Sequence, residues 1–199
     1  EDDFFNIRNF LREVFLLNDR LEHSWNVARF DYWRYHHIQT CHVCPPFDQV
    51  TAAWVTDTGK IVAVLHPILQ NEIRLHIHPG FRTLELEDEI FTYAEQHFSS
   101  QTGDGNRILY APVFSDDHLR QEVLTRRGFT NPPGWGHHWR RDLDSPLPVA
   151  PIPKGFVIRS MGLVAEHPAR SLASWKAFHS EEQDGRYNGD FSWYQNIQS

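Results

Sequence analysis

The sequence predicts an α/β domain of the α+β kind, with a mixed, mostly antiparallel central sheet flanked by helices, followed by the start of a second copy. Three observations predict this class. Apolar residues recur at helical spacing near the N-terminus, alternating segments separated by turn residues follow, and a proline-rich stretch precedes a segment that repeats the same order. The 199 residues, 40% of them hydrophobic, suffice for one full core and an appendage.

Two helices are predicted first. Phe4, Ile7, Leu11 and Val14 recur at steps of three and four after an acidic first turn, which predicts a helix over about 3–17. An aromatic-rich second helix is predicted through 25–36, ended by the break over 39–48. Its aromatic residues either pack in the core or line an acceptor pocket: Trp25, Tyr32, Trp33 and Tyr35.

A three-strand meander is predicted next. The segment 50–56 is rich in strand-forming residues, 57–60 supplies turn residues, and 61–65 is the returning strand. The segment 72–78 alternates between two faces. One face carries Ile73, Leu75 and Ile77, and the other carries Glu72, Arg74, His76 and His78.

A crossover follows the meander. The pattern predicts a helix over 84–98 and a strand over 107–113, with a Gly-Asp-Gly turn between them. A short helix is predicted over about 116–127, with Ser115 as its N-cap and Gly128 as its C-cap. A last strand is predicted over 135–143.

The segment 142–154, DLDSPLPVAPIPK, marks a domain boundary because its four prolines favour an extended spacer. The predicted organisation is therefore a domain over 1–143, a linker over 144–154 and the beginning of a second domain over 155–199. In that last part the pattern predicts a strand at 155–159 and two helices, at 168–179 and 191–197.

Composition disfavours several classes of function. The formal net charge of -7 and a pI near 6.0 provide no basic field, so nucleic acid is not an expected partner. No apolar run approaches the length of a membrane span, and no signal peptide opens the sequence, so no membrane partner is expected. The two cysteines are too few and too close for a disulfide framework, which favours the cytoplasm.

Three short segments in this order resemble the GNAT superfamily of N-acetyltransferases. The strand end HPGFR at 78–82 resembles the family's entry into its cofactor loop, and RGF at 127–129 is similar to the L-G-F that follows its last major helix. GFVIRSM at 155–161 looks like the first strand of another copy. The resemblance covers about 3–143 and 155–199, and it implies the N-terminal half of a tandem protein whose own first strand is missing.

The resemblance implies an acetyl-coenzyme A site with a degenerate loop. The family's R/Q-x-x-G-x-G/A loop binds the pyrophosphate through backbone N–H groups. The position-equivalent residues here are Ile77, Arg82, Thr83, Glu85 and Glu87. Two glutamates thus occupy the small positions, and each charge within about 4 Å of the phosphate would cost roughly 4 kcal/mol per unit charge at an effective dielectric of about 20.

The short helix departs from the family as well. The family's N-x-x-A-x-x-L-Y run aligns with Asp117, Arg120, Val123 and Leu124, so its frequent general-acid tyrosine is a leucine here. We therefore expect that this domain does not bind acetyl-coenzyme A productively. The remaining candidate catalytic residue is Glu72, which is either a general base for an amine or an exposed strand residue with a solvated charge.

A second chemical reading concerns the segment 36–44, HHIQTCHVC. It holds five potential metal ligands, including the pair Cys41 and Cys44, and this spacing is half of a zinc site. His76 and His78 are the candidates for the other half. Because a structural site needs four converging ligands, we expect no resident metal.

The function implied by the resemblance is acetyl transfer from acetyl-coenzyme A to a primary amine of a small molecule or peptide, carried out by the second domain. The alternative is a non-enzymatic ligand-binding or interaction module. The expected partners are the amine or peptide acceptor and the protein's own second domain. The strand predicted at 156–159 would either pair with the first sheet's edge or exchange between two chains, giving a homodimer.

Overall fold

The computed structural model describes residues 2–21, 23–39, 42–131, 144, 146, 149–181 and 187–189. The chain divides into two compact units, Glu1–Thr130 and Asn131–Ser199. The strand predicted over 135–143 and the helix predicted over 191–197 lie outside the described residues. No helix in the described part of the chain is long and apolar enough to cross a membrane.

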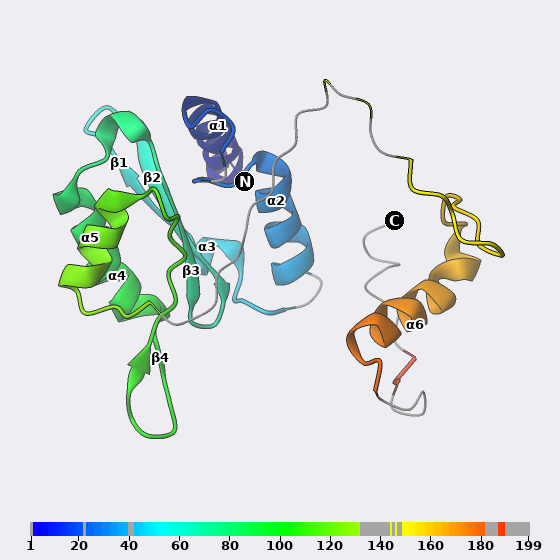
Figure 1. Cartoon of the computed structure of the whole chain (residues 1–199). Coiled ribbons are helices and arrows are strands. Elements are labelled where there is room, and N and C mark those ends of the chain that lie inside the picture. The colour runs from blue at the N-terminus through cyan, green and yellow to red at the C-terminus, as the bar shows by residue number, and fades with distance from the viewer. Residues whose placement is uncertain are drawn as a thin grey trace. The chain divides into compact units, whose positions relative to one another are not determined.

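The first unit is a mixed α+β structure around a three-stranded antiparallel sheet (Figure 1). The strands are β1 (Ala52–Val55), β2 (Ile61–Leu69) and β3 (Glu72–Ile77), in the order β1-β2-β3. Gly59 turns the chain between the first two strands with φ +81°, a backbone conformation that residues other than glycine rarely adopt. The predicted meander is confirmed, although β2 runs four residues further than expected.

Helices cover both faces of this sheet. Helix α1 (Asp2–Leu17) packs on one face, and α4 (Leu84–Phe98) packs on the other (Figure 1). Both helices have the bounds that their apolar spacing predicted, to within a residue. Because neither face is open, β2 is buried continuously from Val62 to Pro67. His76 is therefore 1% exposed, although the alternation places it on the same face of the strand as Glu72 and Arg74.

The predicted second helix is shifted by two residues toward the C-terminus and changes its winding. It begins at Val27, with the Asn26 side chain accepting a hydrogen bond from the Arg29 N–H, and α2 (Val27–Tyr32) continues as a π-helix over Trp33–Ile38. Trp25, Phe30 and Trp33 are buried in the core. A four-residue helix, α3 (Phe47–Val50), follows Pro46 and leads into β1.

The crossover after α4 is only partly regular. A two-residue hairpin of β4 (Ser100–Gln101) and β5 (Arg107–Ile108) replaces most of the strand predicted over 107–113. Beyond it Tyr110 alone pairs with β3, in parallel, through Ile73 N–H to Tyr110 O at 3.0 Å and Tyr110 N–H to Asn71 O at 2.7 Å. Pro112 lacks the N–H that a longer ladder would need.

Helix α5 (His118–Arg126) closes the first unit. Its N-cap is Asp117, whose carboxylate accepts a hydrogen bond from the Arg120 N–H, and not Ser115 as predicted. The capping side chain must lie within reach of the third N–H of the helix, which begins two residues later than expected. Gly128, at φ +80°, ends the helix as predicted.

In the second unit, a 3-10 turn over Val164–Glu166 leads into α6 (His167–Phe178), which confirms the helix predicted there. The strand predicted at 155–159 is wrong for this structure. Phe156, Val157 and Ile158 are 72–84% exposed, and they form no strand pairing with any of the described residues. A β-branched sequence cannot form a strand without a partner for its backbone groups.

Candidate functional site

The predicted cofactor loop lies between β3 and α4. After Ile77 the chain makes a 3-10 turn over Pro79–Phe81, in which the His78 imidazole accepts a hydrogen bond from the Gly80 N–H at 3.0 Å. Thr83 then caps α4, because its hydroxyl accepts a hydrogen bond from the Leu86 N–H at 3.1 Å. This loop brings the Arg82 side chain over the first turns of α4 and α5.

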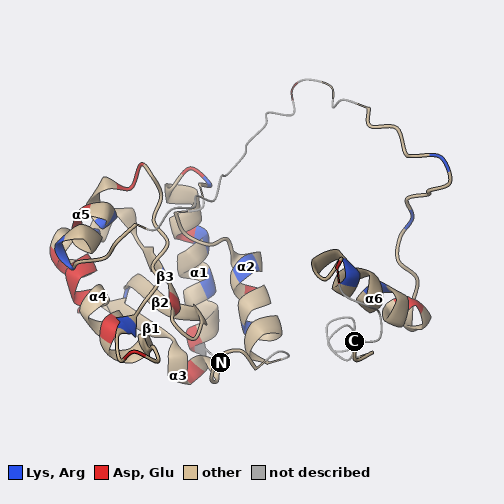
Figure 2. Ribbon diagram, turned by 60° about the horizontal axis from the view of Figure 1, so that its bottom comes forward, with Lys and Arg blue, Asp and Glu red and all other residues tan. Residues whose placement is uncertain are grey.

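Four charged side chains meet there, and we call them the Arg82 cluster: Arg82, Glu87, Asp117 and Arg120. The Glu87 carboxylate accepts hydrogen bonds from Arg82 Nε at 2.5 Å and from Arg120 Nε at 3.1 Å. Arg82 Nη2 also donates to Asp117 Oδ1 at 2.6 Å. Acidic residues lie along α4, whereas α5 carries both acidic and basic residues (Figure 2). The cluster therefore ties the two helix N-termini together.

The cluster is buried, so its charges depend on one another. Glu87 is fully inaccessible, and Asp117 and Arg120 are buried as well. Burial opposes the charge on Arg82, but the carboxylates of Glu87 and Asp117 outweigh it and raise the pKa of Arg82. Burial would likewise raise the pKa of Asp117, yet Arg120 and Arg82 outweigh it and lower that pKa. Arg82 and Asp117 are thus held in their charged forms.

The other predicted site residues lie apart from the cluster. Glu85 is exposed, and hydrogen bonds from its own backbone N–H and from Thr83 lower its pKa. Ile77 is buried in the core. Glu72 lies at the opposite end of β3, about 17 Å from Ile77 along a strand that rises about 3.3 Å per residue. The structure therefore joins Arg82 and Glu87 but leaves Glu72 at a separate place.

Sequence reasoning missed Asp117 as a partner of Arg82 and Arg120 as a second partner of Glu87. The available signal was the spacing of three residues between Asp117 and Arg120 at the start of a helix. At that spacing an arginine can face the aspartate that caps the helix. What that spacing could not show is that α5 returns to the α4 N-terminus. A hollow of about 370 Å³ lies beside the cluster, and its walls include Arg82, Asp116 and Asp117.

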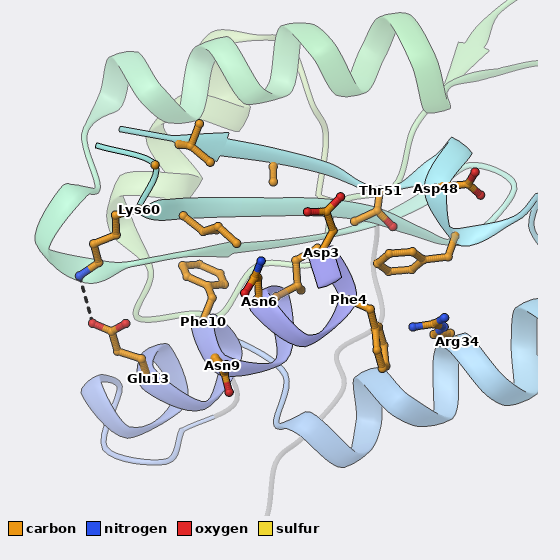
Figure 3. Close-up of a pocket in the computed structure, with 16 residues that line it drawn as sticks. Asp3, Phe4, Asn6, Asn9, Phe10, Glu13, Arg34, Asp48, Thr51 and Lys60 are labelled. Carbon is orange, nitrogen blue, oxygen red and sulfur yellow. Dashed lines mark hydrogen bonds and ion pairs between the residues drawn. The ribbon is translucent and has the colours of Figure 1, made fainter. Parts of the chain in front are cut away.

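A larger groove of about 620 Å³ lies between α1 and the β1–β2 hairpin (Figure 3). We call it the α1–β1 groove. Helix α1 supplies one wall, with Asn6, Asn9 and Phe10 among its residues, and Ala53 and Val55 of β1 supply the other. Its volume is in the range of about 300–1,000 Å³ that is usual for ligand pockets. No sequence pattern marked it, because its walls come from segments about forty residues apart.

The two ends of this groove differ in charge. At one end Lys60 Nζ donates to Glu13 Oε1 at 3.1 Å, and His78 Nε2 lies 3.1 Å from the same oxygen (Figure 3). The hydrogen bond from Lys60 is the main cause that lowers the pKa of Glu13. At the other end the Arg34 guanidinium lies 3.8 Å from the centroid of the Phe4 ring. None of the carboxylates of the described residues forms an ion pair with Arg34.

A pair of buried histidines lies in the core on the α1 face of the sheet. His76 Nδ1 accepts from the Trp25 N–H at 3.2 Å, the two Nε2 atoms of His76 and His66 are 3.1 Å apart, and His66 Nδ1 lies 3.1 Å from the Pro67 oxygen. Only one arrangement of neutral rings satisfies all three contacts. His76 donates from Nε2 to His66, and His66 donates from Nδ1 to Pro67.

The surroundings keep this pair neutral. Burial lowers the pKa of His66 to about 3 and that of His76 well below its usual range. The cations nearby act in the same direction, since Arg74 lowers both and Arg120 and Arg29 lower that of His76. The rings of Trp25, Phe30 and Trp33 pack around His66, with the Trp33 centroid 4.1 Å away. The His66–His76 pair is therefore part of the packed core.

The candidate zinc ligands do not lie together in the structure. His76 is engaged in the core, His78 lies at the Glu13 end of the groove, and Cys44 is a buried free thiol whose Sγ donates to the Ile68 oxygen at 3.4 Å. Cys41 lies outside the described residues. Within the ranges that are described, no three His, Cys, Asp or Glu side chains converge as metal ligands do.

The fold and these sites define a small mixed α+β unit with a buried ionic cluster and a separate groove. Comparison of the chain with models of protein families, with curated proteins and with solved structures gave no match.

Proposed function

We propose that the Glu1–Thr130 unit is a GNAT-like domain that does not bind acetyl-coenzyme A and serves as a non-catalytic module of an acetyltransferase-family protein. The order of elements supports this proposal. Two helical segments precede an antiparallel three-strand meander, a crossover helix returns the chain to a parallel contact with β3 at Tyr110, and a short helix follows. The loop that would hold the cofactor pyrophosphate then falls between β3 and α4.

One observation carries the non-catalytic part of the proposal. Arg82, the residue equivalent to the start of the cofactor loop, is already paired with Glu87 and Asp117. A diphosphate binding there would have to displace two carboxylates, one of which has no access to solvent. The chain's own carboxylates thus occupy the electrostatic role that a phosphate would have, and removing them from Arg82 would leave charges buried without partners.

The helix N-terminus is also partly occupied. The Leu86 N–H donates to the Thr83 hydroxyl, and the Glu87 N–H donates to the Thr83 carbonyl at 3.1 Å. Anions bind helix N-termini through such free N–H groups. With these donors engaged and Asp116 and Asp117 lining the adjacent hollow, a diphosphate would meet mainly negative charge.

Acetyl transfer to a primary amine is assigned in this proposal to the second domain, whose beginning we place at 155. The first domain would then brace its partner or shape the acceptor site. Glu72, which forms an isolated parallel bridge with Tyr110, remains the candidate base if the first domain has chemistry of its own.

Calorimetric titration of the full chain with acetyl-coenzyme A tests the proposal. We expect no saturable binding up to about 1 mM. Micromolar binding that Arg82→Ala abolishes, while Arg126→Ala on the exposed face of α5 leaves it intact, would overturn the proposal. Saturable binding that Arg82→Ala does not change would place the cofactor outside this loop and would also count against a domain that binds no acetyl-coenzyme A.

A further inference from the structure

The α1–β1 groove runs along the open edge of the sheet. Strand β1 pairs with β2 on one side and, within residues 2–131 as described, with no strand on the other. Edge strands present a row of unpaired N–H and C=O groups, and proteins usually protect them with charged residues or proline. Ala52–Val55 has neither. This edge can therefore pair with an added extended chain.

The walls of the groove suit a peptide backbone and apolar side chains. Ala53 and Val55 are exposed on β1 and face the groove. On α1, Asn6 and Asn9 lie one turn apart and both line the groove, and in Figure 3 the Asn6 side chain points toward the strands; neither carboxamide makes a hydrogen bond to any other described residue. An amide side chain offers a donor and an acceptor, which match a peptide group. Ile7 of α1 adds apolar surface to the lining.

Arg34 supplies a positive charge at one end. Its guanidinium stacks on Phe4 at 3.8 Å and lies 5.2 Å and 5.4 Å from the Phe47 and Tyr35 centroids. Its Nε is buried without a hydrogen-bond partner, and so is the hydroxyl of Thr51, which also lines the groove. A guanidinium held in a plane by aromatic rings keeps its fork of donors available for a carboxylate.

We propose that the α1–β1 groove binds the C-terminal end of an extended apolar peptide, which adds to the β1 edge and pairs its terminal carboxylate with Arg34. The positions of the charges fix its direction. Arg34 and Thr51 lie at the end of the groove where β1 begins, and Lys60 lies at the other end (Figure 3). A chain that ends at Arg34 therefore runs antiparallel to β1, with about four residues along this four-residue strand.

Two carboxylates also line the groove, those of Asp3 and Asp48. Both residues are exposed and lie toward the Arg34 end of the groove (Figure 3), where water and salt screen their charges more than that of the partly buried Arg34. The Asp3 and Asp48 carboxylates would repel a second negative charge on the peptide, whereas Arg34 can still pair with a single carboxylate. The expected partner is therefore a peptide whose last four residues are apolar and whose only charge is its C-terminus.

The proposal does not depend on the absence of acetyl-coenzyme A binding, because the groove shares no residue with the Arg82 cluster. The probe is the tetrapeptide acetyl-Ala-Val-Ile-Val, titrated into the full chain by calorimetry as the free acid and as the C-terminal amide. We expect the acid to bind at least about tenfold more tightly than the amide, since a charge-assisted pair with arginine is lost in the amide.

Three variants locate the site. Arg34→Gln should remove the preference for the acid, Arg34→Lys should retain part of it, and Ala53→Asp on the edge strand should weaken both peptides. Arg126→Gln serves as the control and should change neither. Thermal unfolding of each variant shows whether it is folded, and a folded Arg34→Gln that keeps the full preference for the acid overturns the proposal.

Two further results would also overturn it. One is equal binding of acid and amide, or no binding of either at about 1 mM. The other is a concentration-dependent dimer of the chain, seen by sedimentation, that excludes the peptide and is lost in Ala53→Asp. That result would assign the groove to a second copy.

Discussion

Glu87→Gln tests the Arg82 cluster most directly. The substitution keeps the volume of the side chain and one hydrogen-bond acceptor but removes the charge that two arginines share. Arg82 then retains only Asp117 as an anionic partner at 2.6 Å, and Arg120 retains only the same carboxylate at 4.0 Å. Because Glu87 is fully buried, water cannot replace the lost charge.

The expected cost follows from this geometry. Removing one partner of a buried ion pair costs about 3–5 kcal/mol, and the amide oxygen that remains recovers part of it, so we expect about 3 kcal/mol. With a slope of about 2 kcal/mol per molar urea, the unfolding midpoint should fall by roughly 1.5 M. In a double-mutant cycle with Arg120→Met, the coupling free energy should be about 1–3 kcal/mol, since the two side chains share a contact.

Equilibrium urea unfolding, followed by circular dichroism on the full chain, measures these differences. The control is Glu122→Gln, which breaks the exposed pair with Arg126 on the outer face of α5. Exposed pairs contribute at most about 1 kcal/mol, so this variant should lie close to the parent protein. A Glu87→Gln variant as stable as Glu122→Gln, or a cycle with no coupling, would refute the view that the cluster joins α4 to α5.

Three other changes probe the fold. In the unfolded chain His66 and His76 titrate near pH 6.5, whereas in the fold their pKa values are lowered, so their contribution to stability is complete above pH 6.5 and is lost as the pH falls toward 3. The lowered pKa of His66 alone should reduce the free energy of unfolding by about 2 kcal/mol at pH 5. The urea midpoint measured against pH tests this, and a midpoint that stays constant from pH 7 to 5 would contradict it. Gly128→Ala should lower the free energy of unfolding in urea by about 1 kcal/mol, because φ is +80° at this position and an added Cβ would meet no other atom, so that backbone strain is the whole cost. Gly103→Ala, where an added Cβ also meets open space but φ is not positive, should cost less. Thr83→Ala removes the N-cap of α4 and should lower thermal stability by about 1 kcal/mol, and an unchanged melting temperature would argue against the capping bond.

Much of the fold could be predicted because its signals are local. The bounds of α4, the meander and the ending of α5 at Gly128 follow from side-chain periodicity and turn residues, which act over a few positions. Predictions failed where a distant partner decides the outcome. The segment 155–159 has the composition of a strand but forms no strand pairing with the described residues, and within 107–113 the contact with β3 is made through Tyr110.

The candidate sites show the same division. The sequence by itself determined that Arg82 precedes a helix and that Glu85 and Glu87 occupy positions where a phosphate loop needs small residues. Only the tertiary structure decided that Glu87 turns inward to Arg82 and Arg120 while Glu85 remains in solvent, and that His76 lies in the core against His66. The physical reason is that charge pairing and burial depend on which segments the fold brings together. Periodicity along the chain does not indicate which distant segments these are.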